Sequence, residues 1–166
     1  MSDDHEAVGS SQKVEQVWET PAPDEIVELT KAHVQAMETM TDDIVWVQAG
    51  MHHILLHTVG RKSGKVHKVA LPTWVDPDGH RVVVASFAGA KNHPSWFLNL
   101  RDRSEPNLHI RVQTGEFYSN AEILEGDDRQ RTWDGLVADR AWYTDYQAKT
   151  DRQIPLVRFP ETEWIT

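Results

Sequence analysis

The sequence contains no cysteine among its 166 residues. A chain without cysteine has no disulfide framework, no thiolate metal site and no cysteine nucleophile. It also lacks any apolar run near the roughly 18 residues that a membrane-spanning helix needs. The first residues lack the basic start and apolar stretch of a signal peptide. Together these absences predict a cytoplasmic protein.

Positive charge is also scarce, because 26 acidic residues face 17 basic ones and give a formal net charge of −9. This balance argues against a nucleic-acid partner. The excess lies within residues 1–43, since residues 44–166 hold equal numbers of acids and bases. A run at residues 61–68 carries four bases and no acid: Arg61, Lys62, Lys65 and Lys68. Such a run on a glycine-bearing loop attracts phosphate or polycarboxylate, with a solvated charged turn as the alternative.

Three regions are expected along the chain. Residues 1–20 are polar, acidic and without periodicity, which predicts a flexible N-terminus. Residues 21–43 contain a predicted helix from about 24 to 40 with a narrow apolar stripe. The acids of this helix make it unlike helices that lie on anionic membranes, so we expect no peripheral membrane contact. Residues 44–166 form the body of the domain.

Short apolar segments in the body predict a largely β structure. Strands are expected at 52–58, 68–75, 80–87, 107–113, 117–124 and 154–159, and helices at 94–102 and 127–140. The tetrapeptide Asp-Pro-Asp-Gly at 76–79 favours a hairpin turn. Pro72 should lie at a sheet edge or a bulge, because proline cannot donate to the ladder. Mostly antiparallel strands with helices between them indicate an α+β fold compatible with a small barrel.

The glycine-bearing basic loop does not match the known phosphate-loop motif. Only three residues separate Gly60 from Gly64, and Val66 follows Lys65 where serine or threonine would bind magnesium. No G-x-G-x-x-G is present, which argues against a dinucleotide site of the Rossmann type. Backbone N–H groups and bases in a glycine turn still hold a phosphate without either motif.

Metal and hydrolase chemistry receive little support. His53 and His57 fall in a predicted strand, where residues four apart are about 13 Å apart. H-E-x-x-H is absent although the chain has nine histidines, so we predict no metal site. No G-x-S-x-G turn accompanies Ser86, which argues against a serine hydrolase.

Aromatic residues accompany a second glycine turn. Trp96 follows a predicted strand end, a glycine turn and a helix start, where free N–H groups favour a polar ligand edge. Tyr143 and Tyr146 are three apart and share a face if that segment is helical. A barrel with a basic loop, an aromatic turn and a tyrosine pair suits an aromatic, anionic cofactor.

Four segments, at 58–65, 83–90, 93–100 and 143–155, resemble the deazaflavin-dependent nitroreductase family. The resemblance covers about residues 45–160 and leaves the acidic N-terminus outside. It implies a split β-barrel of mostly antiparallel strands with flanking helices. It also implies an oxidoreductase that uses the deazaflavin coenzyme F420, in a family best known from actinobacteria.

The resemblance assigns two groups of cofactor-binding residues. The phosphate and the start of the glutamate tail would lie on the basic turn, at Arg61, Lys62, Ser63, Gly64 and Lys65. His67 stands where the family commonly has arginine, so Lys68 is a candidate substitute. The deazaflavin ring would lie against the following positions: Ala85, Ser86, Phe87, Ala88, Gly89, Asn92, His93, Pro94, Ser95 and Trp96.

The resemblance also implies the reaction. Tyr143, Tyr146 and Ser86 match residues that line the substrate site, whereas two other family tyrosines fall on Pro72 and Arg140. Nitroimidazole activation is therefore not expected. We predict hydride transfer from reduced F420 to an electron-poor small molecule such as a quinone, enone or nitroaromatic, by a monomer or homodimer. The alternatives are an FMN oxidoreductase, a non-catalytic F420 carrier, and a binding domain without a cofactor.

Overall fold

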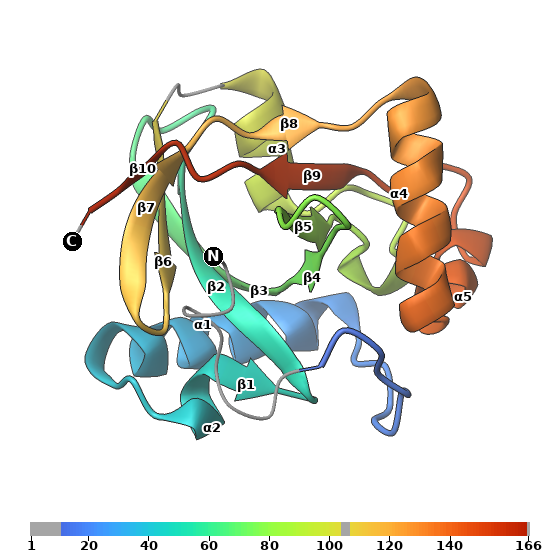
Figure 1. Ribbon diagram of the computed structural model, residues 1–166, viewed down its shortest axis with the longest axis horizontal. Helices are drawn as coiled ribbons and strands as arrows, with labels where there is room; N and C mark the ends of the chain where they lie inside the picture. The colour runs from blue at the N-terminus through green and yellow to red at the C-terminus, as the bar shows by residue number, and fades with distance from the viewer. Residues whose placement is uncertain (1–10, 104–106, 166) are drawn as a thin grey trace.

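The computed structural model describes residues 11–103 and 107–165, whose strands form two antiparallel sheets (Figure 1). The first sheet has the order β1-β2-β6-β7-β10, with β3 paired to β2. Its strands are β1 (Val47–Gln48), β2 (Met51–Val59), β3 (Val66–Pro72), β6 (Leu108–Val112), β7 (Gly115–Ser119) and β10 (Glu163–Trp164). The second sheet has the order β4 (Trp74–Val75), β5 (Arg81–Val84), β9 (Leu156–Phe159) and β8 (Glu122–Ile123).

Helices surround the sheets, which confirms the predicted α+β class. They are α1 (Pro23–Thr39), α2 (Asp43–Trp46), α3 (Ser95–Asp102), α4 (Gly126–Asp139) and α5 (Trp142–Ala148), with a 3-10 turn η2 (Phe87–Gly89). Helix α1 crosses β3, where Thr30 Oγ1 accepts from Ala70 N at 3.1 Å and Lys68 pairs with Glu38 at 2.9 Å. No helix within the described ranges is long and apolar enough to span a membrane.

Several predicted strands are confirmed, and the Asp-Pro-Asp-Gly segment forms the expected β4–β5 hairpin. Gly79 N donates to Asp76 O at 2.9 Å in this turn. Pro72 ends β3, which pairs with β2 alone among the strands of residues 11–103 and 107–165, so it lies at an edge as expected.

Three predicted strands were too long, and in two of them the chain leaves one sheet for the other. The segment 68–75 breaks at Thr73, whose N and Oγ1 both donate to His52 O at 2.9 Å. The segment 117–124 divides into β7 and β8 of different sheets. The segment 80–87 ends as a strand at Val84. An alternating apolar pattern continues through such corners, so hydrophobicity alone does not reveal them.

Residues 11–20 lie against the body through backbone hydrogen bonds. Ser11 N donates to Gly50 O at 2.9 Å, and Val14 N donates to Asp139 O at 3.1 Å. Residues 1–10, the rest of the segment expected to be flexible, lie outside the described residues.

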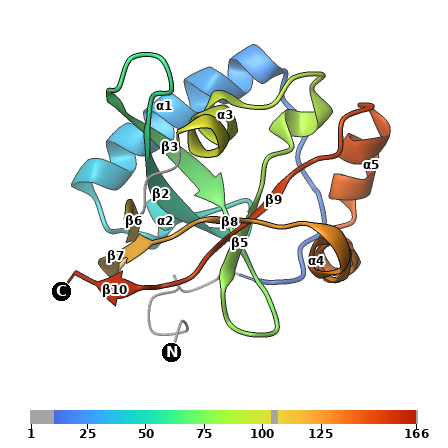
Figure 2. The ribbon, with the colours of Figure 1, turned by 90° about the horizontal axis from the view of Figure 1, so that it is seen from above.

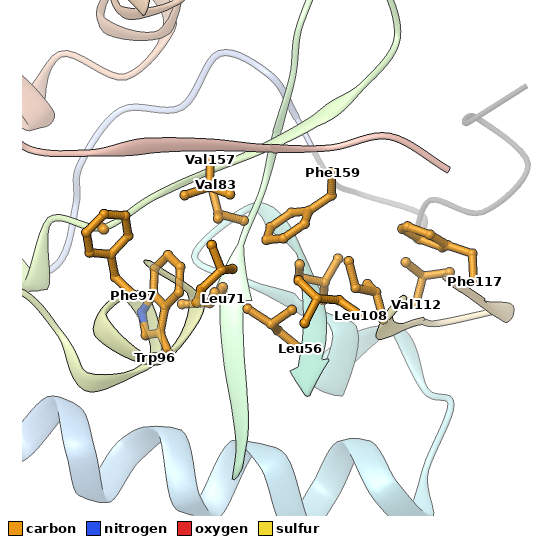
Figure 3. Close-up of a cluster of buried hydrophobic side chains, with 14 residues drawn as sticks. Leu56, Leu71, Val83, Trp96, Phe97, Leu108, Val112, Phe117, Val157 and Phe159 are labelled. Carbon is orange, nitrogen blue, oxygen red and sulfur yellow. The ribbon is translucent and has the colours of Figure 1, made fainter. Parts of the chain in front are cut away.

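The main hydrophobic core fills the space between the two sheets (Figure 3). Leu56 and Val83 come from opposite sheets and are completely buried. Trp96 and Phe97 extend from α3 into the same cluster, which ties that helix to the barrel. Burial of apolar surface at about 25 cal/mol per Å² makes this core the main source of stability.

An arginine-centred cluster joins the second sheet to α4. Arg158 Nε donates to Asp76 Oδ2 at 2.9 Å, and its two terminal nitrogens each donate to an Asp128 oxygen at 3.0 Å. The hydrogen bonds from Arg158 lower the pKa of Asp128. This cluster holds α4 beside the second sheet, and α5 follows α4 directly in the chain.

Candidate active site

A cleft of about 830 Å³ lies between α1, β3, the turn after β5 and helix α5. Residues 67–72 contribute to its lining along the length of β3. The turn joining β2 to β3 therefore borders one end of the cleft, and α5 borders the other; Figure 2 shows these two elements on opposite sides of the molecule. The cleft places a basic group and an aromatic group at its two ends.

The basic turn at residues 60–65 is stabilised by its own backbone. Gly60 N donates to Lys65 O at 2.7 Å, and Gly64 N donates to Gly60 O at 2.9 Å. Ser63 Oγ accepts from Lys65 N at 3.1 Å. The side chains of Lys62 and Lys65 are left exposed to solvent. The turn thus presents positive charge on a compact loop.

Asn99 is a residue of this site that the sequence reasoning missed. Its Oδ1 accepts from Arg61 N at 3.2 Å and from Arg61 Nη1 at 2.8 Å, and its Nδ2 donates to Thr58 Oγ1 at 3.4 Å. It is buried, lines the cleft and connects α3 to the basic turn. An amide on the apolar face of the predicted helix 94–102 was the available signal, because buried polar groups need partners.

The turn at residues 86–90 has an unusual backbone. Phe87, Ala88 and Gly89 have φ angles of 47°, 55° and 77°. Left-handed conformations in residues other than glycine cost about 1–3 kcal/mol each and concentrate at functional sites. Gly89 is required for a second reason, since a Cβ there would lie 2.6 Å from Tyr146 O. Both Phe87 and Ala88 line the cleft.

Arg152 holds this turn in place and was also missed. Its Nε donates to Ala90 O at 2.9 Å, Nη1 to Ala85 O at 3.1 Å, and Nη2 to Ser86 O at 2.7 Å. Nη1 also contacts His93 Nδ1 at 3.1 Å. Burial and the charge of Arg152 lower the pKa of His93, which therefore accepts this hydrogen bond as a neutral ring. Arg152 lies in the segment 143–155 that carried part of the family resemblance. An arginine in a sequence does not by itself indicate that its partners are backbone carbonyls.

The aromatic end of the cleft is built on α5. Tyr143 and Tyr146 are buried, and their ring centroids lie 5.9 Å apart at 82°. Burial raises the pKa of Tyr143 to about 12, so this phenol keeps its proton at neutral pH. Trp18 packs edge-on against Trp142 at 5.0 Å and lines the cleft with it. The expectation that the tyrosine pair shares one helical turn is confirmed.

His53 is a buried histidine in the cleft wall. Its Nδ1 lies 2.9 Å from Met51 O, and burial lowers its pKa to about 3. The ring is therefore neutral at physiological pH and offers no fixed charge. Another pair, His57 and His109, is stacked at 4.2 Å on the first sheet. No group of three or more histidine, aspartate or glutamate side chains in the described part of the chain could hold a metal ion.

Most of the residues proposed from the sequence meet in this single cleft. Those that line it are Arg61, Lys62, Ser63, His67, Lys68, Ser86, Phe87, Ala88, His93, Pro94, Ser95, Trp96, Tyr143 and Tyr146. Those outside its lining are Gly64, Lys65, Ala85, Gly89 and Asn92. Lys68 is bonded to Glu38 of α1, which limits its freedom to replace an arginine at the basic turn.

Comparison with known proteins gives a family match over most of the chain. The family described as F420H(2)-dependent quinone reductase matches residues 29–160. An F420H(2)-dependent quinone reductase of Mycobacterium tuberculosis is 33% identical over 107 residues, which span 63% of this chain and 70% of that protein. A second, putative quinone reductase of the same species is 32% identical over 104 residues, or 85% of its length.

Solved structures agree with this match. An F420-H2 dependent reductase aligns with a TM-score of 0.56 and 34% identity, covering 65% of this chain and 93% of that one. A protein described as a domain-swapped dimer aligns with the same TM-score and 30% identity, covering 84% of this chain and all of the other. The predicted split-barrel fold is confirmed.

Proposed function

The chain belongs to the F420H(2)-dependent quinone reductase family, and we propose on this basis that its cleft binds reduced F420 and delivers the hydride to a quinone. The observation that carries the proposal is the arrangement of the cleft, with a basic turn at one end and buried tyrosines at the other. Membership alone does not assign residues; the contacts in the cleft support the assignment below.

The residues of the basic turn fit an anionic cofactor tail. Gly60 faces the concave side of the turn, because a Cβ there would lie 2.5 Å from Ser63 Oγ and 2.8 Å from His67 Nε2. The absence of a side chain at Gly60 lets Ser63 and His67 close over the turn, and in this proposal the side chains of Arg61 and Lys62, which line the cleft, hold the phosphate. Lys62 and Lys65 supply charge for the carboxylates of the tail. Asn99 positions Arg61 at this end through two hydrogen bonds.

The turn 86–90 and the start of α3 suit the flat ring. Phe87, Ala88 and Trp96 present apolar surface to the cleft, and Arg152 fixes the carbonyls of the turn from behind. A rigid wall matters because hydride transfer requires reacting atoms about 3–3.5 Å apart. The cofactor supplies the hydride and the protein supplies position and electrostatics.

Hydroxyl groups beside the ring site suit the acceptor. Tyr143, Tyr146 and Ser86 line the cleft near the turn 86–90. In this proposal they donate hydrogen bonds to the acceptor oxygen as negative charge develops there. Tyr143 is suited to this role because its high pKa keeps the proton on the phenol. Water or a hydroxyl group then provides the proton that completes reduction.

A cofactor titration followed by turnover tests the proposal. Oxidised F420 should quench tryptophan fluorescence saturably, because Trp96 lines the ring site. Reduced F420 should then be oxidised under anaerobic conditions only when a quinone such as menadione is added. The variant Trp96→Phe is the control for the origin of the quenching, and it should bind F420 with a smaller signal.

The alternatives give different results in the same experiment. Tight FMN binding without F420 binding would identify an FMN oxidoreductase. F420 binding without turnover on quinones, enones or nitro compounds would identify a carrier. A cytoplasmic location and a monomeric or dimeric state stay predictions, and the domain-swapped relative makes the dimer worth testing by size-exclusion chromatography.

A further inference from the structure

Residues 11–22 form an extended strap along the body, with alternate side chains facing in opposite directions. The partly buried members are Val14, Gln16, Trp18 and Thr20. The exposed members are Lys13, Glu15, Val17 and Glu19. This period of two is that of an extended chain with one face against a surface. The acids of the strap thus face solvent, and its inner face is available to the cleft.

Arg140 anchors the outer end of the strap. This side chain is only 1% exposed, and its Nε donates to Gln12 O at 3.0 Å and its Nη2 to Ser11 O at 2.9 Å. Its Nη1 donates to Thr73 O at 2.6 Å, at the corner where the chain changes sheets. Tyr143 N donates to Arg140 O at 3.3 Å, so the residue that ends α4 is also bonded to the first turn of α5, which carries the tyrosine pair.

The inner end of the strap reaches the tyrosines directly. Trp18 packs edge-on against Trp142. Gln16 Nε2 donates to Thr20 Oγ1 at 3.1 Å, and Thr20 Oγ1 lies 3.3 Å from Tyr146 Oη. Trp18 and Tyr146 both line the cleft. A segment far away in sequence therefore contacts the hydroxyl group assigned above to the acceptor.

We propose that the strap is the acceptor-side wall of the cleft, that Thr20 orients the Tyr146 hydroxyl, and that Arg140 is the positioning residue that fixes the strap. The proposal rests on the proposed function, because it concerns how the same site holds its acceptor. It adds two residues and a segment that neither the family match nor the cleft chemistry assigns.

The chain of hydrogen bonds from Gln16 through Thr20 to Tyr146 explains how Thr20 acts. Gln16 Nε2 donates to Thr20 Oγ1, either hydroxyl can donate in the contact between Thr20 and Tyr146, and in the proposal Thr20 is the donor. Tyr146 then directs its own proton into the cleft toward a carbonyl oxygen. A hydroxyl that accepts one hydrogen bond also donates more strongly, which favours an oxygen that gains negative charge.

Substitutions at Thr20 test the orienting role. Thr20→Val keeps the shape and removes the hydroxyl, so kcat with menadione should fall about tenfold while the Kd for F420 stays within about twofold. Thr20→Ser restores the hydroxyl and should recover most of the rate. Val17→Thr is the matched control, because this side chain is 90% exposed on the outer face of the same strap. Equal loss in Thr20→Val and Thr20→Ser, or no loss in either, would overturn the role of Thr20.

Trypsin cleavage tests the anchor in the absence of cofactor and substrate, and turnover of menadione gives a second readout. Lys13 is exposed, but the backbone on either side of it is bonded to the body at Ser11 and Val14. Arg140→Gln should accelerate cleavage after Lys13 about tenfold and raise the KM for menadione, with Arg140→Lys intermediate. Cleavage after Lys62 in the distant basic turn should be unchanged, which separates strap release from unfolding.

The two proposals fail in different ways. Wild-type protein that neither binds nor oxidises reduced F420 contradicts the proposed function. Wild-type protein that turns over, together with normal KM and normal cleavage after Lys13 in Arg140→Gln, contradicts the strap alone. If Arg140→Gln does not fold, the Thr20 pair still decides the matter in folded protein.

Discussion

The two turns that border the cleft are held in opposite ways. The basic turn, residues 60–65, carries exposed lysines and closes on itself through short-range backbone hydrogen bonds. The turn at residues 86–90 adopts three successive left-handed residues and is fixed from behind by Arg152, which lies 62 positions after Ala90 and 66 after Ser86. One turn offers charge at the surface; the other offers a fixed shape.

This difference indicates how the work of the site is divided. Exposed charges attract an anionic group over several ångströms, but salt screens them and their geometry is adaptable. A strained turn that is held by hydrogen bonds from a distant residue lowers the stability of the fold, but it keeps the groups that it carries in a fixed position. We expect binding strength to depend in part on the first turn, and both binding and rate to depend on the second.

Replacement of Arg152 should have the largest effect. Arg152→Gln cannot replace hydrogen bonds to three carbonyls and His93, so the free energy of unfolding should fall by about 2–4 kcal/mol. The Kd for F420 should rise about a hundredfold as the turn loses its shape. Chemical denaturation and fluorescence titration measure the two effects. Arg129→Gln removes a buried arginine outside the lining of the cleft and should cost stability without changing the Kd.

Gly89→Ala should come next. Its φ of +77° disfavours alanine, and the new Cβ would meet Tyr146 O at 2.6 Å. We expect about 1–3 kcal/mol of destabilisation and a roughly tenfold loss of kcat/KM. Gly79→Ala is the matched control, since its φ is +87° with no atom within 4 Å of the added Cβ. Equal loss of activity in both variants would mean that backbone strain at any turn is enough to lower activity. The turn at residues 86–90 would then have no special role in the site.

The exposed lysines should give the smallest effect. Lys62→Ala should raise the Kd for F420 about two- to fivefold at low ionic strength and hardly at all in 0.5 M salt, because screening at about 0.5 M shortens the range of its charge. The midpoint of thermal unfolding should not change. Arg131→Ala removes another exposed charge, on α4, and should leave the Kd unchanged at both salt concentrations. A salt-independent loss would show that Lys62 acts by a fixed contact.

The sequence predicted elements well where one physical signal dominated. Helix 94–102 and strand 107–113 match α3 and β6 closely, since their boundaries coincide with a proline or with clear alternation. The break in the strand at Thr73 could not be predicted from the sequence, because it depends on hydrogen bonds to His52 O in a neighbouring strand. The contacts of residues 11–20 were not predicted for a related reason. Their inward faces become apparent only when the body against which they pack is known.

The site shows the same limit. Residues with a distinctive type, such as Trp96 and Tyr146, were proposed from the sequence and line the cleft. Asn99, Arg140 and Arg152 were not assigned these contacts, although each organises a wall of the cleft. Their partners are mostly backbone carbonyls and amides, which every residue possesses. No sequence pattern indicates which carbonyl a buried guanidinium will find.

The choice of carbonyl partners gives the cleft a tolerance to acid. Carbonyl oxygens do not take up protons in the range where aspartate side chains titrate. The hydrogen bonds from Arg140 and Arg152 to the main chain therefore persist as the pH falls, whereas the contacts of Arg158 with Asp128 weaken once the pH falls through the lowered pKa of Asp128. Acidification should thus loosen the seam between α4 and the second sheet before these anchors of the cleft give way.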